Sequence, residues 1–311
     1  MGLRILDPAC GDGVFLAAAR AVILEYLDAR ARAVGDAAPS IETRDRLARE
    51  VLHGVDLDPQ AVAAARRRLG PPETRRRGAA AADPLRLRCG NTLLTPEMLD
   101  VVGASAAERR RLRPWDPAGP DGFGEVLAAG GFDFVLGNPP FGASARLAPL
   151  ERHLLRGAYT LATAGQPDLF QLFYERTMGA LLRPGGTHVF LVPDALLARD
   201  ELAATRRAVI RSLSITRLVA IGAVFTGAPG ADARRVAVSV VGVIGVKRPA
   251  RCPPTVVVER WRGGRPALRT ALPRAQLCPD GGEPWALAAP RDWFGPRGFR
   301  ARVEAGGLRL G

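Results

Sequence analysis

The sequence is poor in cysteine and has no long apolar run. Four cysteines occur in 311 residues, and none belongs to a C-x-x-C pair: Cys10, Cys89, Cys252 and Cys278. This spacing excludes a zinc ribbon and a disulfide scaffold, and it fits the reducing cytoplasm. No apolar run reaches the roughly 18 residues that cross a bilayer, and the first residues lack the apolar core of a signal peptide. We therefore expect a cytoplasmic protein without a membrane partner.

Acidic residues are scarce in the last third of the chain. The whole sequence has 44 basic and 31 acidic residues, a net charge of +13, and Lys247 is its only lysine. Residues 1–200 carry 25 basic and 24 acidic side chains, whereas residues 201–311 carry 19 and 7. A basic part joined to a neutral part suggests a surface that meets a polyanion. A merely solvated basic surface is the alternative.

Short apolar runs alternate with helical patterns along most of the sequence. The hydrophobic share of 47% and the charged share of 24% are those of a globular protein. Seven strands are predicted, at Leu3–Leu6, Val51–Leu57, Leu85–Cys89, Phe132–Leu136, His188–Val192, Leu218–Phe225 and Val236–Val246. The main helices are predicted at Val14–Val34, Gln60–Leu69, Asp168–Leu182 and Leu202–Leu213. This alternation predicts a doubly wound α/β fold with a mostly parallel, seven-stranded sheet.

The composition divides the chain near residue 248. Residues 1–248 contain the alternating pattern, so we expect them to form one domain. Residues 249–311 are rich in glycine, proline and arginine, and only Thr255–Trp261 has a strand pattern there. We expect these residues to form a short irregular extension, with a remnant of a target-recognition region as one interpretation. Residues 103–131 are expected to form a short helix and a long loop.

A glycine-rich turn follows the first predicted strand, in the segment Asp7–Gly13. Gly11 and Gly13 allow a tight turn and a close approach to a ligand. The spacing matches neither a dinucleotide fingerprint nor a P-loop, so the ligand need not carry a phosphate. Asp56 ends the next strand, where a carboxylate can accept hydrogen bonds from a ribose diol. A turn carboxylate is the alternative, and Asp58 is interpreted as a helix N-cap.

The segment Asn138-Pro139-Pro140-Phe141 follows the fourth predicted strand. The two prolines lack backbone N–H groups and stiffen the chain. The Asn138 amide oxygen and a proline carbonyl can then accept the two N–H groups of a planar amine, such as N6 of adenine. Phe141 offers an apolar face on which such a ring can stack.

These segments carry a family resemblance. The run Asp7–Leu16 resembles motif I of S-adenosylmethionine-dependent DNA adenine-N6 methyltransferases, and Asn138–Phe141 resembles their catalytic N-P-P-[YF] motif. The motif order is similar to that of the gamma group and of the methylase part of combined restriction–modification enzymes, over roughly residues 3–246. The resemblance implies a Rossmann-like class I fold, S-adenosylmethionine as cofactor and double-stranded DNA as substrate. It implies neither a metal nor a covalent enzyme intermediate.

The resemblance also implies roles for single residues. The cofactor would be held by Asp7, Pro8, Ala9, Cys10, Gly11, Gly13, Asp56, Leu57 and Asn91. In this set Asp56 matches the ribose-binding acid, Leu57 lies against the cofactor adenine, and Asn91 meets its amino group. Catalysis would use Asn138, Pro139, Pro140 and Phe141, and Phe225 falls near the aromatic residue that sandwiches the flipped base. Asp168 resembles an acidic position before a helix in the family, with a plain N-cap as the alternative.

Other functions remain open at this point. The N-P-P-[YF] motif also occurs in methyltransferases that act on protein glutamine or on RNA, and an inactive DNA-binding remnant is a third alternative. Family members carry a cofactor-binding segment before motif I and a target-recognition domain after the methylase domain. Only Met1 and Gly2 precede the first predicted strand here. Residues 249–311 are few for a target-recognition domain, so we expect a separate subunit or segment to supply target recognition. No nuclease motif is visible, so we expect methylation without cleavage by this chain.

Overall fold

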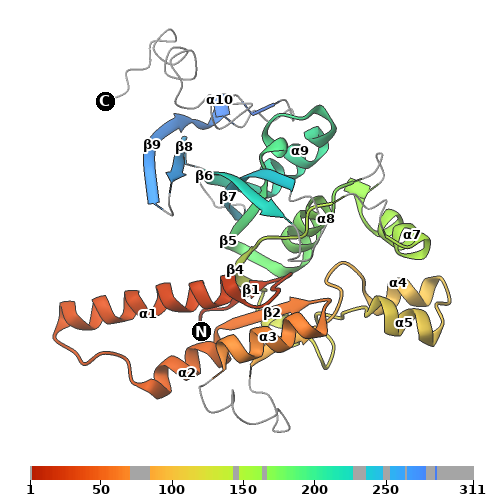
Figure 1. The fold of residues 1–311 in the computed structure, drawn as a ribbon, viewed down its shortest axis with the longest axis horizontal. Coiled ribbons are helices and arrows are strands. Elements are labelled where there is room, and N and C mark those ends of the chain that lie inside the picture. Colours follow the sequence, from red (N-terminus) through yellow and green to blue (C-terminus); the bar gives the residue numbers. More distant parts are fainter. Residues whose placement is uncertain are drawn as a thin grey trace. The chain divides into compact units, whose positions relative to one another are not determined.

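The computed structural model describes residues 2–70, 85–142, 147–162, 167–226, 236–247, 253–262, 265–277 and 284–285. The chain forms two compact units, Met1–Gly186 and Thr187–Gly311. Each unit combines strands with helices (Figure 1). Within the described ranges, no helix is both long enough and apolar enough to span a bilayer.

Four parallel strands organise the first unit. They are β1 (Ile5–Asp7), β2 (Leu52–Asp56), β3 (Arg86–Cys89) and β4 (Phe132–Gly137), in the order β3-β2-β1-β4. In register, Ile5 of β1 lies opposite Leu52 of β2 on one side and Phe134 of β4 on the other. The carboxyl ends of these four strands therefore meet at one edge, as the sequence predicts.

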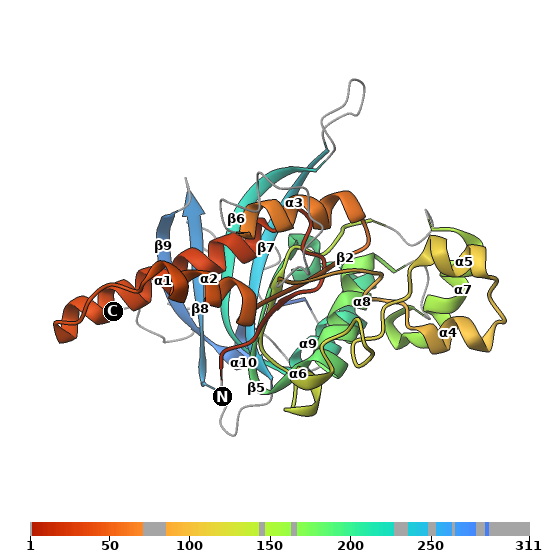
Figure 2. The ribbon, with the colours of Figure 1, turned by 90° about the horizontal axis from the view of Figure 1, so that it is seen from below.

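Helices fill the connections between these strands and the stretch that follows β4. They are α1 (Val14–Val34), α2 (Ile41–Glu50), α3 (Pro59–Leu69), α4 (Pro96–Val101), α5 (Ala106–Leu112), α6 (Gly124–Ala128), α7 (Pro149–Ala158), the 3-10 turn η2 (Thr160–Ala162), α8 (Leu169–Arg176) and the π-helical η3 (Thr177–Leu181). The predicted bounds of α1 are confirmed, and α3 begins after its predicted N-cap Asp58. α1 and α3 pack side by side (Figure 2).

Two local predictions differ from the structure. Residues 103–131 contain two short helices, α5 and α6, instead of one. The helix predicted to run to Leu182 ends one residue earlier, at Leu181, because β5 is already extended from Leu182. A proline disfavours helical backbone at the preceding residue, so Pro184 disfavours a helix that includes Arg183.

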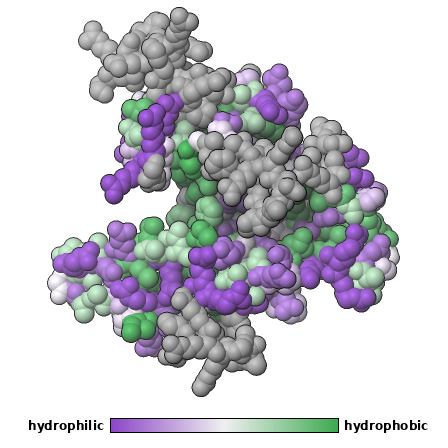
Figure 3. Space-filling view, viewed as in Figure 1, coloured by the Kyte–Doolittle hydropathy of each residue, from purple (hydrophilic) through white to green (hydrophobic). Residues whose placement is uncertain are grey.

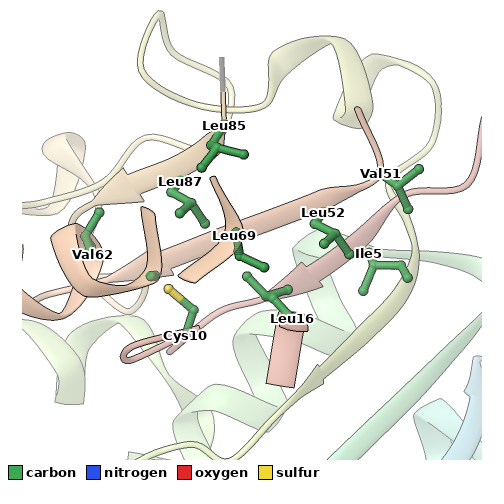
Figure 4. Packing of buried hydrophobic residues seen from close by; sticks show 10 residues of the cluster. Ile5, Cys10, Leu16, Val51, Leu52, Val62, Leu69, Leu85 and Leu87 are labelled. Atoms are coloured by element: carbon green, nitrogen blue, oxygen red, sulfur yellow. The ribbon is translucent and has the colours of Figure 1, made fainter. Parts of the chain in front are cut away.

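A cluster of buried side chains lies under the glycine-rich turn. It joins β1, β2, β3, α1 and α3 and includes Ile5, Cys10, Leu16, Val51, Leu52, Val62, Ala65, Leu69, Leu85 and Leu87. Figure 4 shows the Cys10 sulfur pointing into this cluster. A Cβ atom at Gly54 would lie 2.8 Å from Leu87 and 3.0 Å from the Cys10 sulfur, so only glycine lets β2 approach these side chains.

α1 contributes to this cluster mainly through its first turns. Leu16 is fully buried, whereas Val22 and Tyr26, further along α1, are each 64% exposed. On the face shown in Figure 3, hydrophilic and hydrophobic residues are interspersed over α1 and α3. The beginning of α1 is thus the part that the core fixes in place.

The second unit is a mixed arrangement of strands. β5 (Leu182–Pro193) starts in the first unit and continues into the second, which also contains β6 (Leu213–Thr226), β7 (Val236–Lys247), β8 (Thr255–Arg262) and β9 (Arg265–Pro273), in the order β5-β7-β6-β8-β9. Its helices are η4 (Asp194–Leu197), η5 (Asp200–Leu202), α9 (Ala203–Ser212) and α10 (Arg274–Leu277). β7 is antiparallel to both β5 and β6, β8 is parallel to β6, and β9 is antiparallel to β8.

The α/β class is confirmed, but the prediction of a seven-stranded, mostly parallel sheet is wrong. The described residues form nine strands of mixed direction. Only residues 227–235 connect β6 to β7, and a parallel connection needs roughly a dozen or more. Likewise only residues 263–264 connect β8 to β9. Part of the segment expected to be irregular is therefore a pair of strands, and β9 was not predicted at all.

Candidate active site

Hydrogen bonds connect the segments that follow β1, β2 and β3. The N–H of Gly11 donates to Asp56 Oδ2 at 2.8 Å, and the N–H of Gly90 donates to the Asp56 carbonyl at 2.9 Å. The buried hydroxyl of Thr92 donates to the Pro8 carbonyl at 2.6 Å. The three segments that the sequence assigns to the cofactor therefore form one continuous site.

The glycine-rich turn depends on two glycines with positive φ. Gly11 has φ 53° and Gly13 has φ 80°, values that favour glycine. A Cβ atom at Gly13 would lie 3.0 Å from Cβ of Ala65 in α3, so a side chain there would also crowd α3. Gly13 is the N-cap of α1 and has no side chain to cap it, so the N–H groups of the first turn have no side-chain acceptor at this position.

The Cys10 side chain takes no part in this surface. It is 5% exposed, and burial raises the pKa of its thiol well above the usual range. Its N–H donates to the Val55 carbonyl, and its own carbonyl accepts from Gly13. The backbone of Cys10 shapes the turn, and a cofactor contact by this residue stays a prediction.

Both carboxylate oxygens of Asp56 accept backbone N–H groups. Oδ2 accepts from Gly11 and Oδ1 accepts from Asp58 at 2.9 Å. Each oxygen keeps a further lone pair, so the carboxylate is fixed and can still accept from a diol. Leu57, the next residue, is 46% exposed and offers an apolar surface. Asp58 accepts from the N–H of Gln60 at 2.8 Å, which confirms that it caps α3.

Asn91 is buried in the same site and its amide is held at both ends. Oδ1 accepts the N–H of Leu93 at 3.0 Å, and Nδ2 donates to Oε1 of Glu151 in α7 at 3.3 Å. Burial raises the pKa of Glu151, while the hydrogen bond from Asn91 and the charge of Arg111 oppose that rise. Sequence reasoning missed Glu151, which lies 60 positions further along the chain and belongs to no motif.

A second missed residue, Arg113, lies at the rim of the site. It has φ 47°, unusual for a residue with a side chain. Its guanidinium Nη1 lies 3.0 Å from the Cys89 sulfur and 3.5 Å from the Leu57 carbonyl oxygen. Cys89 also lines a cavity of about 520 Å³ beside β3, which none of the residues predicted for cofactor or catalysis line.

The N-P-P-F segment follows β4 directly beside the glycine-rich turn. A Cβ atom at Gly137 would lie 2.7 Å from Oδ1 of Asp7, so the carboxylate packs against the backbone just before Asn138. Asp7 is 1% exposed and accepts the N–H of Ala9 at 3.1 Å. Burial raises the pKa of Asp7 to about 7, although the hydrogen bond from Ala9 lowers it.

The four residues of the segment differ in exposure. Asn138 and Pro140 are exposed, Pro139 is buried and Phe141 is partly buried. Among the described residues none makes a hydrogen bond to the Asn138 amide, so its oxygen can accept from a ligand. Phe225 lies in β6 of the second unit, opposite Ala237, and its side chain is outside the described part of the structure. Its role as a base-stacking residue stays a prediction.

Asp168 is the N-cap of α8 in a capping box with Gln171, as one interpretation of the sequence expects. It also does more, because its Oδ1 accepts the N–H of Gly142 at 2.9 Å. Gly142 directly follows Phe141. The carboxylate thus connects α8 to the end of the N-P-P-F segment, which the sequence did not indicate.

The arrangement suits S-adenosylmethionine. The turn leaves room for a close approach, the Asp56 carboxylate is fixed and can still accept from a diol, and Leu57 and Asn91 offer an apolar surface and an amide. Asp7 adds a buried carboxylate where the turn meets β4.

Similar proteins belong to restriction–modification systems. The Type II methyltransferase M.TthHB8I of Thermus thermophilus is 38% identical over 102 residues, which are 31% of this chain and 23% of that protein. A chain of a type I restriction–modification system has a TM-score of 0.55 at 16% identity, covering 98% of this chain and 58% of that one. The type IIL enzyme MmeI, solved with DNA, has a TM-score of 0.53 at 17% identity, covering 86% and 34%. These two structures show that the fold is shared.

The sequence pattern of the Eco57I restriction-modification methylase family matches residues 50–225, which is more than half of the chain. This range contains Asp56, Asn91 and the N-P-P-F segment. The chain spans less than a quarter of the length of the curated relative. S-adenosylmethionine is the cofactor, in agreement with the fit of the site. The chain belongs to the Eco57I restriction-modification methylase family.

Proposed function

We propose that this chain transfers the methyl group of S-adenosylmethionine to the N6 amino group of adenine in double-stranded DNA, as the modification enzyme of a restriction–modification system. The observation that carries the proposal is the contact between Asp7 and Gly137. It sets the cofactor turn after β1 beside Asn138 after β4, on two paired parallel strands. A methyl donor and an amino acceptor bound at these two segments would be neighbours.

The chain's own residues supply positioning. S-adenosylmethionine supplies an electrophilic methyl group on a sulfonium. The Asn138 amide oxygen and the Pro139 carbonyl accept the two N6 hydrogens, which directs the nitrogen lone pair toward the turn. Because Pro139 and Pro140 have no N–H group, no backbone donor of theirs competes for the acceptors. Positioning of this kind accounts for most of the rate when the leaving group is already good.

The adenine has to leave the duplex to reach Asn138. Flipping a base costs a few kcal/mol of lost stacking and pairing. Phe141, partly exposed beside Asn138, would stack on the flipped ring, and Phe225 would be its second aromatic contact. The excess of basic over acidic residues after residue 200 would neutralise phosphates, so DNA binding should weaken steeply with salt.

Target recognition is proposed to come from outside residues 1–248, which would form the methyltransferase domain. Residues 249–311, or a separate subunit, would then contribute to the choice of site. The protein is proposed to act in the cytoplasm, where the DNA of a prokaryotic cell is found.

Methyl transfer tests the proposal directly. The purified chain is incubated with unmethylated duplex DNA and methyl-labelled S-adenosylmethionine, and the DNA is digested to nucleosides. Label in N6-methyladenine, absent for an Asn138→Ala chain, is expected. Label in another base, or only in parallel reactions with RNA or protein, would refute the proposed substrate.

A further inference from the structure

Asp168 and Gly142 form a two-way link between α8 and the N-P-P-F segment. Oδ1 of Asp168 accepts the N–H of Gly142 at 2.9 Å, and the Gly142 carbonyl accepts the N–H of Leu169 at 3.1 Å. The two bonds run in opposite directions between the same two stretches of chain. They hold both the N–H group and the carbonyl group of Gly142.

The α8 side of this link is firmly anchored. The N–H of Asp168 donates to Oε1 of Gln171 at 2.7 Å, which completes a capping box. Phe170, Leu172 and Tyr174 of α8 are at most 1% exposed. The Asp168 carboxylate therefore lies on a helix that buried side chains hold in place.

The other side of the link is the point where the segment can bend. Pro139 and Pro140 have fixed φ angles, whereas Gly142 has φ 147° and no side chain. The amino end of the segment is already fixed, because Gly137 ends β4 against Asp7. At the other end of the segment, Gly142 has the widest choice of backbone conformations, and the Asp168 carboxylate restrains it.

We propose that Asp168 is a positioning residue for methyl transfer: it holds Gly142, and through it sets the Asn138 amide and the Phe141 ring for the target base. The inference rests on the proposed function for its kinetic consequence, but the link itself can be tested without activity. A displacement of about 1 Å at a reacting group lowers a rate by about 100-fold. Loss of the link should therefore reduce kcat and leave cofactor binding unchanged.

Two substitutions separate this role from helix capping. Asp168→Ser keeps a good N-cap, but the serine hydroxyl is one atom shorter and cannot also hold Gly142. Asp168→Asn keeps the length of the side chain and one oxygen, which can still accept the N–H of Gly142. Ser105→Ala is the matched control, because Ser105 forms a capping box with Glu108 at the start of α5 and has no link to the segment.

The full chain carrying each substitution is compared with wild type in four measurements. These are thermal melting, S-adenosylmethionine affinity, kcat on DNA, and hydrogen exchange of the Gly142 amide. We expect Asp168→Ser to melt near the wild-type temperature, with unchanged cofactor affinity, kcat lower by about 10- to 100-fold and faster exchange at Gly142. Asp168→Asn should restore kcat and slow exchange, and Ser105→Ala should lower the melting temperature without lowering kcat.

Two results would overturn the inference. One is wild-type kcat and wild-type Gly142 exchange in Asp168→Ser. The other is a loss of kcat in both Asp168→Ser and Ser105→Ala in proportion to their loss of stability. If the wild-type chain methylates no DNA, the proposed function has failed, and exchange at Gly142 decides the link alone: faster exchange in Asp168→Ser supports it and unchanged exchange refutes it.

Discussion

Glu151 holds the side-chain amide of Asn91 in one orientation. Its Oε1 lies 3.3 Å from Asn91 Nδ2, although the two residues are 60 positions apart in the sequence. An ionised carboxylate can only accept hydrogen bonds, so the amide must direct its NH2 group toward α7 and its oxygen toward Leu93 and the cofactor site. The orientation of Asn91 is therefore determined by a residue that belongs to none of the sequence motifs.

Removing this carboxylate should weaken cofactor binding. In Glu151→Ala the buried NH2 group of Asn91 loses its partner, which costs about 1–3 kcal/mol, and the amide is free to turn over. We expect the Kd for S-adenosylmethionine, measured by calorimetry, to rise about 10-fold. Glu97→Gln, an exposed change in α4, is the control. An unchanged Kd in Glu151→Ala would show that Asn91 needs no such restraint.

Truncating Asn138 should abolish the chemical step selectively. The Asn138 side chain is exposed, so Asn138→Ala should leave the melting temperature near that of wild type. The rate of methyl transfer under single-turnover conditions should fall by about 1,000-fold or more, with cofactor affinity within about 2-fold of wild type. Equal losses in rate and in cofactor affinity would contradict the role assigned to this amide.

Asp56 and its neighbour Asp58 should respond differently to the same change. In Asp56→Asn one of the two backbone N–H groups, of Gly11 or Asp58, faces an NH2 group instead of an oxygen. We expect cofactor Kd to rise by about 10-fold or more. Asp58→Asn should bind cofactor normally, because asparagine caps a helix as well as aspartate does. Similar losses in both variants would argue against a special role for Asp56.

The buried carboxyl of Asp7 should make stability depend on pH. Its pKa is 3.8 in the unfolded chain and about 7 in the folded one, so the folded state retains the proton between these values. The protonated Asp7 carboxyl contributes its full share to the free energy of unfolding below about pH 4. This contribution, at most about 4 kcal/mol, is lost as the pH rises to about 7.

Urea unfolding at several pH values, in wild type and in Asp7→Asn, measures this dependence. Asp168 and Glu151 also have raised pKa values, but they are present in both proteins. The free energy of unfolding of wild type minus that of Asp7→Asn should therefore fall as the pH rises from about 4 to about 7. A flat difference would mean that Asp7 ionises freely in the folded state.

Two glycine substitutions should have opposite effects on stability. Gly137→Ala places a Cβ atom 2.7 Å from Asp7 Oδ1 and should destabilise the protein by about 1–3 kcal/mol and lower methyl transfer. Gly157→Ala, in α7, meets no atom within 4 Å and should stabilise it by about 0.5–1 kcal/mol. Thermal melting distinguishes the two. Destabilisation by both changes would show that glycine-to-alanine replacement as such is harmful here.

Local features of the fold could be predicted from the sequence. The bounds of α1, the cap at Asp58 and the positions of the first four strands depend on neighbouring residues, and all agree with the structure within a few residues. The sequence also predicted that Asp56 and Asn138 lie at the same edge of the sheet, because parallel strands bring their carboxyl ends together.

Long-range features could not be predicted in the same way. The direction of β7 depends on which strands it joins, and its apolar pattern is the same for either direction. Glu151 and Gly142 acquire their roles from partners far along the chain. One missed signal was available: Gly263-Gly264 between two strand-length segments is typical of a two-residue hairpin, and it would have indicated β9.

The pairing of β1 with β4 determines where insertions and deletions can accumulate during evolution without disturbing the site. Asp7 and Asn138 are neighbours because Leu6 lies opposite Val135 in the ladder, and not because a particular loop joins them. A slip of one residue would turn every side chain of the strand to the opposite face. Loops between the two strands can therefore lengthen or shorten freely, while the strands themselves tolerate no insertion. The same contact would also form if β4 preceded β1 in the sequence.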